Sequence, residues 1–200
     1  MALFEKSLNA IKTLDSTIRT ANETFKAEQK RLLDTYKDPT KQIGEIRAAT
    51  DNTIMQAKAA FHEAITADYN AVRGKVHTVV TAAPPADFLA TLEAIKANGK
   101  NISDYEAAAF VEKYKGNYFA SRTLDEVLTA AGKKLGSYVK KPDHIADEID
   151  KSETMLHNWG RSYTGGSYMT ALLLNHTNPV TMLADTVQQF LDGKYTAEEE

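Results

Sequence analysis

A heptad repeat of apolar residues near the start of this 200-residue sequence constrains its fold more than any other feature. The repeat predicts a helix over residues 3–36, which would be about 50 Å long. Its second register is interrupted, because Ser7, Glu28 and Thr35 occupy positions where a coiled coil needs an apolar side chain. A helix with such a narrow apolar stripe has to pack against a partner. The apolar positions are Phe4, Ile11, Ile18, Phe25 and Leu32 in the first register and Leu14 and Ala21 in the second.

A second long amphipathic helix is predicted from Thr40 to about Ala82. Pro39 ends the first helix and biases Asp38 away from helical backbone. Because the link between the two helices is short, an antiparallel hairpin is the favoured arrangement, and residues 1–82 are expected to form a coiled-coil-like arm. The alternative is that the same apolar seam pairs with another copy of the chain.

A run of one alanine and two prolines at residues 83–85 predicts a domain boundary. Beyond it, shorter apolar stripes at helical spacing predict a helical bundle over residues 83–193. Ser103 and Glu106 form a capping box, which marks the start of one of these helices. The acidic end, residues 194–200, should fray. The expected fold is therefore all-α, with a long N-terminal antiparallel helical hairpin followed by a bundle of shorter helices.

Composition argues against several classes of protein. The sequence contains no cysteine, so disulfides and thiolate metal sites are excluded. No stretch reaches the ~18–20 apolar residues of a membrane span, and the first residues lack the pattern of a secretory signal. We therefore expect a cytoplasmic protein without a membrane partner. Blocks of about five or more like charges are missing, which argues against nucleic acid as a partner.

The charges are unevenly distributed along the chain. Residues 96–141 carry nine Lys or Arg against five Asp or Glu, whereas residues 142–200 carry three against ten. Complementary patches of this kind favour association with another copy or with other proteins of an assembly. Ordinary solvated surface charge is the alternative interpretation.

Two local patterns resemble parts of catalytic or phosphate-binding sites, and both are incomplete. Ser137 and Lys140 have the spacing of a Ser-x-x-Lys nucleophile, but the companion motifs of that enzyme class are missing. Gly165 and Gly166 precede a predicted helix without the lysine of a phosphate-binding loop. We therefore expect no catalytic or cofactor-binding site, and a protein that is not an enzyme.

Two histidine–carboxylate pairs could bind a metal ion. His144 and Glu148 are four residues apart on one predicted helix, and so are Glu153 and His157. Helical pairs at this spacing can provide two ligands, but an ordinary surface ion pair explains them as well. No metal site is therefore expected.

An aromatic group recurs at helical spacing in the predicted bundle. Phe110, Tyr114 and Tyr118 are four residues apart, and Tyr105 and Phe119 lie close to them in the sequence. Such a group can be a core cluster that joins two short helices. It can also be an interface, because tyrosine makes both apolar and polar contacts.

One segment carries a family resemblance. The sequence Glu-Lys-Tyr-Lys-Gly-Asn-Tyr-Phe-Ala at residues 112–120, continued by Ser-Arg-Thr-Leu, resembles a segment of small helical structural or assembly proteins of tailed bacteriophages and prophages. The Asp-Phe-Leu-Ala-Thr-Leu sequence at residues 87–92 and the N-terminal arm are similar to those proteins too. The resemblance covers residues 85–135 and contains no catalytic motif. It implies a structural role in a virion, as an accessory head or scaffold-like protein.

Three functional hypotheses follow. The first is a structural or assembly protein that acts by helix-mediated contacts with itself or with other proteins, in the cytoplasm of the producing bacterium or in a virion. The second is a regulatory or inhibitory protein that captures a host partner. The third is a helical enzyme or metal-binding protein. The expected interface residues are Phe4, Ile11, Leu14, Ile18, Phe25 and Leu32 on the arm and Tyr105, Tyr114 and Tyr118 on the bundle.

Overall fold

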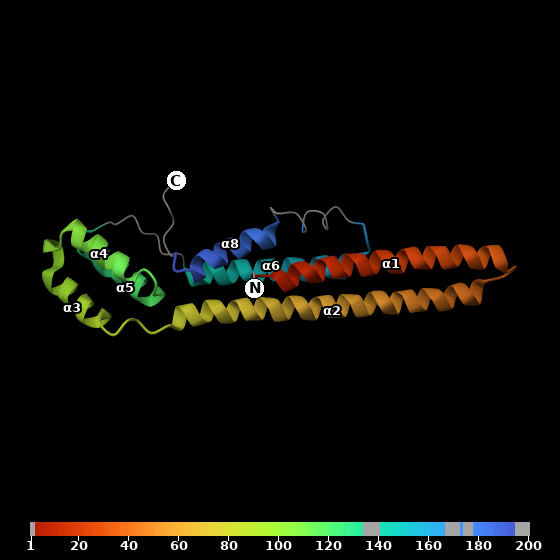
Figure 1. The fold of residues 1–200 in the computed structure, drawn as a ribbon, viewed down its shortest axis with the longest axis horizontal. Coiled ribbons are helices and arrows are strands. Elements are labelled where there is room, and N and C mark those ends of the chain that lie inside the picture. The colour runs from red at the N-terminus through yellow and green to blue at the C-terminus, as the bar shows by residue number, and fades with distance from the viewer. Residues whose placement is uncertain (1–2, 134–140, 167–172, 174–177, 195–200) are drawn as a thin grey trace. The chain divides into compact units, whose positions relative to one another are not determined.

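The computed structural model describes residues 3–133, 141–166, 173 and 178–194. Every regular element that these residues form is a helix, so the prediction of an all-α fold is confirmed (Figure 1). The α-helices are α1 (Glu5–Thr35), α2 (Thr40–Thr81), α3 (Phe88–Asn98), α4 (Asp104–Tyr114), α5 (Tyr118–Ala130), α6 (Pro142–Ser162) and α8 (Pro179–Leu191), and a 3-10 helix, η1 (Gly99–Asn101), follows α3.

The helices group into two compact units that are interleaved along the chain. The first unit comprises Met1–Ala71 and Asp150–Leu183, and the second comprises Val72–Ile149 and Ala184–Glu200. Helices α2, α6 and α8 therefore each contribute residues to both units. The prolines at residues 84 and 85, where the sequence predicts a boundary, both lie within the second unit.

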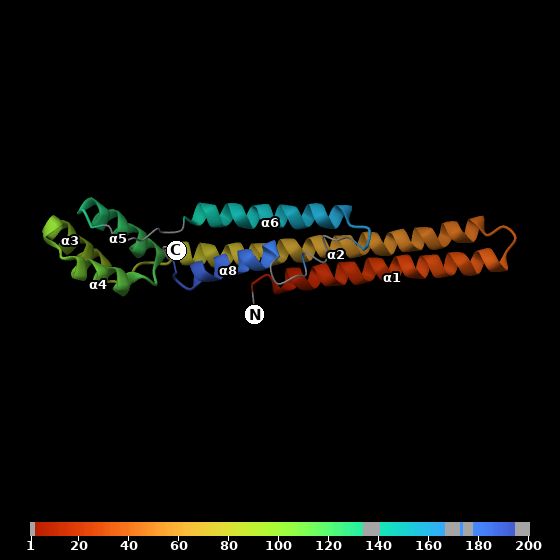
Figure 2. The ribbon, with the colours of Figure 1, turned by 90° about the horizontal axis from the view of Figure 1, so that it is seen from above.

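In the first unit, α1 and α2 are antiparallel and lie side by side in both views (Figure 2). At the start of α1, the backbone N–H and the hydroxyl of Ser7 both donate to Oδ2 of Asp68 in α2, each at 2.8 Å. Further along α1, the guanidinium of Arg47 lies over the Phe25 ring, 5.5 Å from its centroid. Together these contacts define the direction of α2 against α1.

The link between α1 and α2 follows from its sequence. Tyr36 has extended backbone, and this ends α1. Oδ1 of Asp38 accepts hydrogen bonds from the backbone N–H of Thr40, at 3.3 Å, and from the Thr40 hydroxyl, at 2.6 Å. These two bonds stabilise the carboxylate and lower the pKa of Asp38. They also satisfy donors that the first turn of α2 would otherwise leave unpaired.

The apolar seam of α1 is covered within the first unit, with two departures from the heptad pattern. Ser7 occupies a predicted gap, yet it is fully buried and its hydrogen bonds to Asp68 make the gap a polar contact. Phe4 lies just before the helix, with a left-handed backbone (φ 59°), and its ring packs 4.7 Å from that of Tyr69. The buried seam residues are Ile11, Leu14, Ile18 and Leu32.

The second half of α6 packs against α2 through aromatic and hydroxyl groups. The Tyr69 hydroxyl and Oγ of Ser152 are 2.6 Å apart and both residues are buried. The Phe61 ring meets the edge of Trp159 at 5.4 Å between centroids. Gly160, in the last turns of α6, lies directly against the Phe61 ring, so the absence of a side chain there allows the two helices to approach closely.

Gly160→Ala should therefore destabilise the protein although alanine favours a helix. The added Cβ would lie 2.7 Å from Cδ1 of Phe61 and 3.3 Å from Cε1 of His62. We expect urea denaturation to show a loss of about 1–2 kcal/mol, the scale of overpacking a core. Gly44→Ala in α2 is the control, because nothing lies within 4 Å of its Cβ, and it should gain up to about 1 kcal/mol. Equal gains in stability for Gly160→Ala and Gly44→Ala would contradict the close packing at Gly160.

The second unit contains a compact core formed by α3, α4 and α5. The predicted capping box is confirmed: the Ser103 hydroxyl accepts from the Glu106 backbone N–H, and the Glu106 carboxylate accepts from the Ser103 backbone N–H. Asn117 caps α5 and its amide also donates to the carbonyls of Ala82 and Ala83, which holds the end of α2 to this core. The core residues are Phe88, Leu92, Ile95, Ile102, Ala107, Tyr114, Ala120, Leu124 and Leu128.

Candidate functional site: an apolar groove along α1 and α2

A long hollow in the described part of the first unit runs between α1 and α2. One section, of about 560 Å³, lies between residues 16–28 of α1 and 46–53 of α2. A second section, of about 610 Å³, lies between residues 6–17 and 53–64. Thr17 and Thr53 line both sections, so the two hollows form one continuous groove, which we call the α1/α2 groove.

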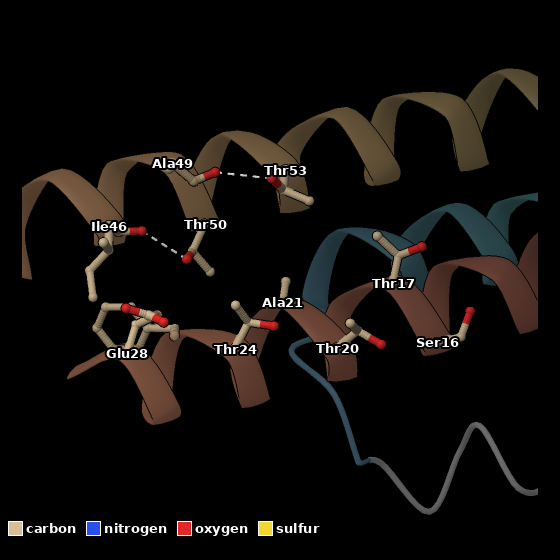
Figure 3. A pocket seen from close by; sticks show the side chains of 11 residues that line it. Ser16, Thr17, Thr20, Ala21, Thr24, Glu28, Ile46, Ala49, Thr50 and Thr53 are labelled. Carbon is tan, nitrogen blue, oxygen red and sulfur yellow. Dashed lines mark hydrogen bonds between the residues drawn. The ribbon is translucent and has the colours of Figure 1, made fainter. Parts of the chain in front are cut away.

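The groove exists because small residues face each other across the two helices. Large side chains at these positions would fill the space between α1 and α2. Figure 3 shows the small side chains of the first section facing one another from the two helices. The small residues of the groove are Ala10, Thr13, Ser16, Thr17, Thr20, Ala21 and Thr24 on α1 and Ala49, Thr50, Thr53, Ala57, Ala60 and Ala64 on α2.

The threonines on α2 present an apolar surface to the groove. The Thr50 hydroxyl donates to the carbonyl of Ile46 at 2.8 Å, and the Thr53 hydroxyl donates to the carbonyl of Ala49 at 3.0 Å (Figure 3). Because each hydroxyl is bonded to the backbone of its own helix, the methyl group is the part left for an external contact. The lining carries only two charged side chains, Lys6 and Glu28. The groove therefore suits an apolar helix face better than a charged ligand.

Most of the interface residues predicted on the arm are buried within the first unit, where a partner cannot reach them. Phe4, Ile11 and Ile18 are at most 1% exposed and pack within the first unit. Leu14 is also buried, but it lines the α1/α2 groove. Phe25 is half-buried beneath Arg47 and lines the same groove.

Of the three tyrosines predicted as interface residues on the bundle, two are buried and one is exposed. Tyr114 and Tyr118 are buried in the second unit, whereas Tyr105 is 86% exposed on α4. The Tyr114 ring packs 5.1 Å from that of Phe88, and its hydroxyl is 2.7 Å from Oγ1 of Thr91. Of the three tyrosines, only Tyr105 is available to a partner in this structure.

Among the residues that the structure describes, the candidate chemical residues form no common site. The backbone N–H of Gly166 donates to the Tyr163 hydroxyl at 3.0 Å, so it is not directed at an external anion. Ser137 and Lys140 lie outside the described residues. His144 is exposed on α6.

A histidine pair that sequence reasoning missed lies between α2 and α6. Nδ1 of His62 and Nδ1 of His157 are 2.7 Å apart, and both side chains are half-buried. Nε2 of His157 lies 3.6 Å from the Glu153 carboxylate. In the described part of the chain, no group of three or more His, Asp or Glu is placed to hold a metal ion. The sequence could not show this pair, because the two histidines are 95 residues apart.

The groove, in contrast, has a sequence signal that was overlooked. Alanine or threonine recurs every three or four residues along one face of α2, from Ala49 through Thr53 and Ala57 to Ala64. Such a stripe indicates close approach of another helix or a shallow groove. The heptad seam itself reaches the groove, because Leu14, Ala21 and Phe25 line it.

Comparisons with family models, with curated proteins and with solved structures found no match. Within the described residues, no helix combines the length and the apolar character needed to cross a membrane.

Proposed function

We propose that this protein is a non-enzymatic assembly protein that acts by helix-mediated protein–protein contact, with the α1/α2 groove as its contact surface. The observation that carries the proposal is the groove itself: an apolar channel lined by residues 6–28 of α1, and thus about 33 Å long at the usual helical rise. A partner helix of about twenty residues could lie along it. The hairpin of α1 and α2 then serves as a coiled-coil-like arm whose open face receives the partner.

The occupant that we propose is a second copy of this chain. Large apolar side chains are exposed on the same two helices, outside the groove: Leu33 is 58% exposed and Met55 is 64% exposed. An arm that carries both a groove and projecting apolar side chains can be complementary to itself, as a two-fold dimer requires. The opposite charge of residues 96–141 and 142–200 supports the same association.

The resemblance of residues 85–135 to structural proteins of tailed phages extends this proposal. It favours a virion component, such as an accessory head or scaffold-like protein, that is made in the bacterial cytoplasm. Capture of a host protein in the same groove is the alternative.

Filling the groove should weaken self-association. Ala57→Leu places a larger side chain in the groove, whereas Ala59→Leu changes an exposed alanine of α2 outside it. We expect the mass of the wild-type protein to rise with concentration in analytical ultracentrifugation, and the dissociation constant of Ala57→Leu to increase at least about tenfold, or about 1.4 kcal/mol. Ala59→Leu should behave like wild type.

Two outcomes would count against this proposal. A wild-type protein that stays monomeric across the whole concentration range does not use the groove for a second copy. An equal effect of Ala57→Leu and Ala59→Leu would place the contact elsewhere on α2. Circular dichroism of both variants checks that helix content is unchanged, so that lost association is not a folding defect.

A further inference from the structure

The histidine pair between α2 and α6 has a geometry that depends on its protonation. Two imidazole nitrogens 2.7 Å apart can share one proton, with one Nδ1 donating and the other accepting. If both rings are protonated, each Nδ1 carries a hydrogen and neither can accept. The hydrogen bond is then lost, and two positive charges face each other. The contact therefore requires that at least one ring is neutral.

The surrounding charges are arranged to keep His62 neutral. Burial, the neighbouring His157, and the cations Arg161 and Lys58 together lower the pKa of His62 from its ordinary value of 6.5. The ammonium of Lys58 donates to the backbone carbonyl of Arg161 at 2.8 Å, so this cation is held close to the pair. The Glu153 carboxylate lies 3.6 Å from Nε2 of His157, the ring nitrogen that does not face His62.

The other polar groups close to the histidine pair do not neutralise a second positive charge on it. The Thr66 hydroxyl of α2 lies 3.3 Å from Nε2 of His157 and carries no charge. On α1, Asp15 and Arg19 pair with each other at 3.0 Å, and Asp15 also accepts a hydrogen bond from the hydroxyl of Tyr163, the residue after α6. Within the described part of the chain, the charged groups that act on His62 are His157, Arg161 and Lys58, and none of them is a carboxylate.

We propose that His62 and His157 form a pH-sensitive latch, which holds α6 against α2 at neutral pH and releases it when both imidazoles are protonated. The latch acts at the packed interface of Phe61, Trp159 and Gly160, because His62 is next to Phe61 in α2 and His157 is one turn before Gly160 in α6. This inference goes beyond the proposed assembly role and does not depend on it.

The direction of the pH effect follows from proton binding. In the released state His62 titrates near 6.5, while in the latched state its pKa is lower. Below pH 6.5 the released state thus binds more protons, and the latched state loses stability as pH falls. One extra proton changes the equilibrium constant by at most about tenfold per pH unit. Above pH 6.5 the latch contributes its full stability.

Trp159 provides a local probe, since it is the only tryptophan of the chain and packs at this interface. We expect urea unfolding followed by Trp159 fluorescence to show an unfolding constant that rises several-fold per pH unit between pH 6.5 and 5. His62→Gln, which keeps a neutral hydrogen-bonding group, should flatten this dependence. His77→Gln changes an exposed histidine on the same helix and should leave the pH dependence of the unfolding constant unchanged. Equal pH dependence in wild type and His62→Gln would overturn the latch.

A measurement on the wild-type protein keeps the test independent of how the variants fold. Proton NMR titration of the five histidines should show one imidazole with a pKa below 6.5. That resonance should be the one missing from the His62→Gln spectrum. If every histidine titrates at or above 6.5, the pair does not resist protonation and the latch is wrong.

Discussion

We expect Ile18→Asp to lower the free energy of unfolding by about 4 kcal/mol or more. Ile18 is 0% exposed at the centre of the apolar seam between α1 and the helices that cover it. The substitution removes a buried aliphatic side chain, which alone costs about 2–5 kcal/mol. It also places a carboxylate where burial of an unpaired charge adds several kcal/mol or forces the group to protonate. Urea denaturation monitored by circular dichroism measures the loss.

Leu33→Asp is the matched control for this prediction. Leu33 is on the same helix and is 58% exposed in the single chain, so the new carboxylate stays in water at a protein concentration low enough to keep the chain monomeric. Its effect should lie within about 0.5 kcal/mol of wild type. Similar losses for the two variants would mean that the seam of α1 does not face the core as the structure has it.

Tyr114→Ala should be the most damaging single truncation among the predicted interface tyrosines. Tyr114 is 2% exposed, its ring packs against Phe88, and its hydroxyl lies 3.1 Å from Oδ2 of Asp87. Removal of a buried aromatic ring costs about 3–5 kcal/mol. We expect thermal unfolding of the full chain to show a loss of that size, with helical content at low temperature retained or reduced only in the second unit.

Tyr105→Ala tests whether burial is the cause. Tyr105 is on the same helix, and it is 86% exposed. This variant should unfold like wild type, to within about 0.5 kcal/mol. If Tyr105→Ala proves as destabilising as Tyr114→Ala, then Tyr105 is covered by a partner in solution, and α4 becomes a second contact surface.

The local parts of this fold could be predicted from the sequence because local chemistry determines them. The predicted helix over residues 3–36 is α1, Glu5–Thr35, and the helix predicted from Thr40 begins there. Pro39 and the capping box at Ser103 act through the backbone of their immediate neighbours, so no knowledge of the tertiary structure is needed to place them.

Tertiary contacts could not be predicted in the same way. Ser7 interrupts the heptad pattern, and the pattern alone cannot show that Asp68, 61 residues away, accepts its hydrogen bonds. His62 and His157 are ordinary polar residues until α2 and α6 lie together. Phe4 fits the heptad repeat by spacing, yet its left-handed backbone places it outside the helix and against Tyr69.

The interleaving of the two units affects how the chain can fold during its synthesis. The first unit begins with Met1 but takes its last segment, Asp150–Leu183, from near the other end. The ribosome therefore exposes α1 and most of α2 long before α6 can cover Phe61 and Tyr69. During that interval the uncovered apolar face of the nascent hairpin is a binding site for chaperones or for other nascent chains. Slow translation of the stretch between α2 and α6 should consequently favour aggregation over native folding.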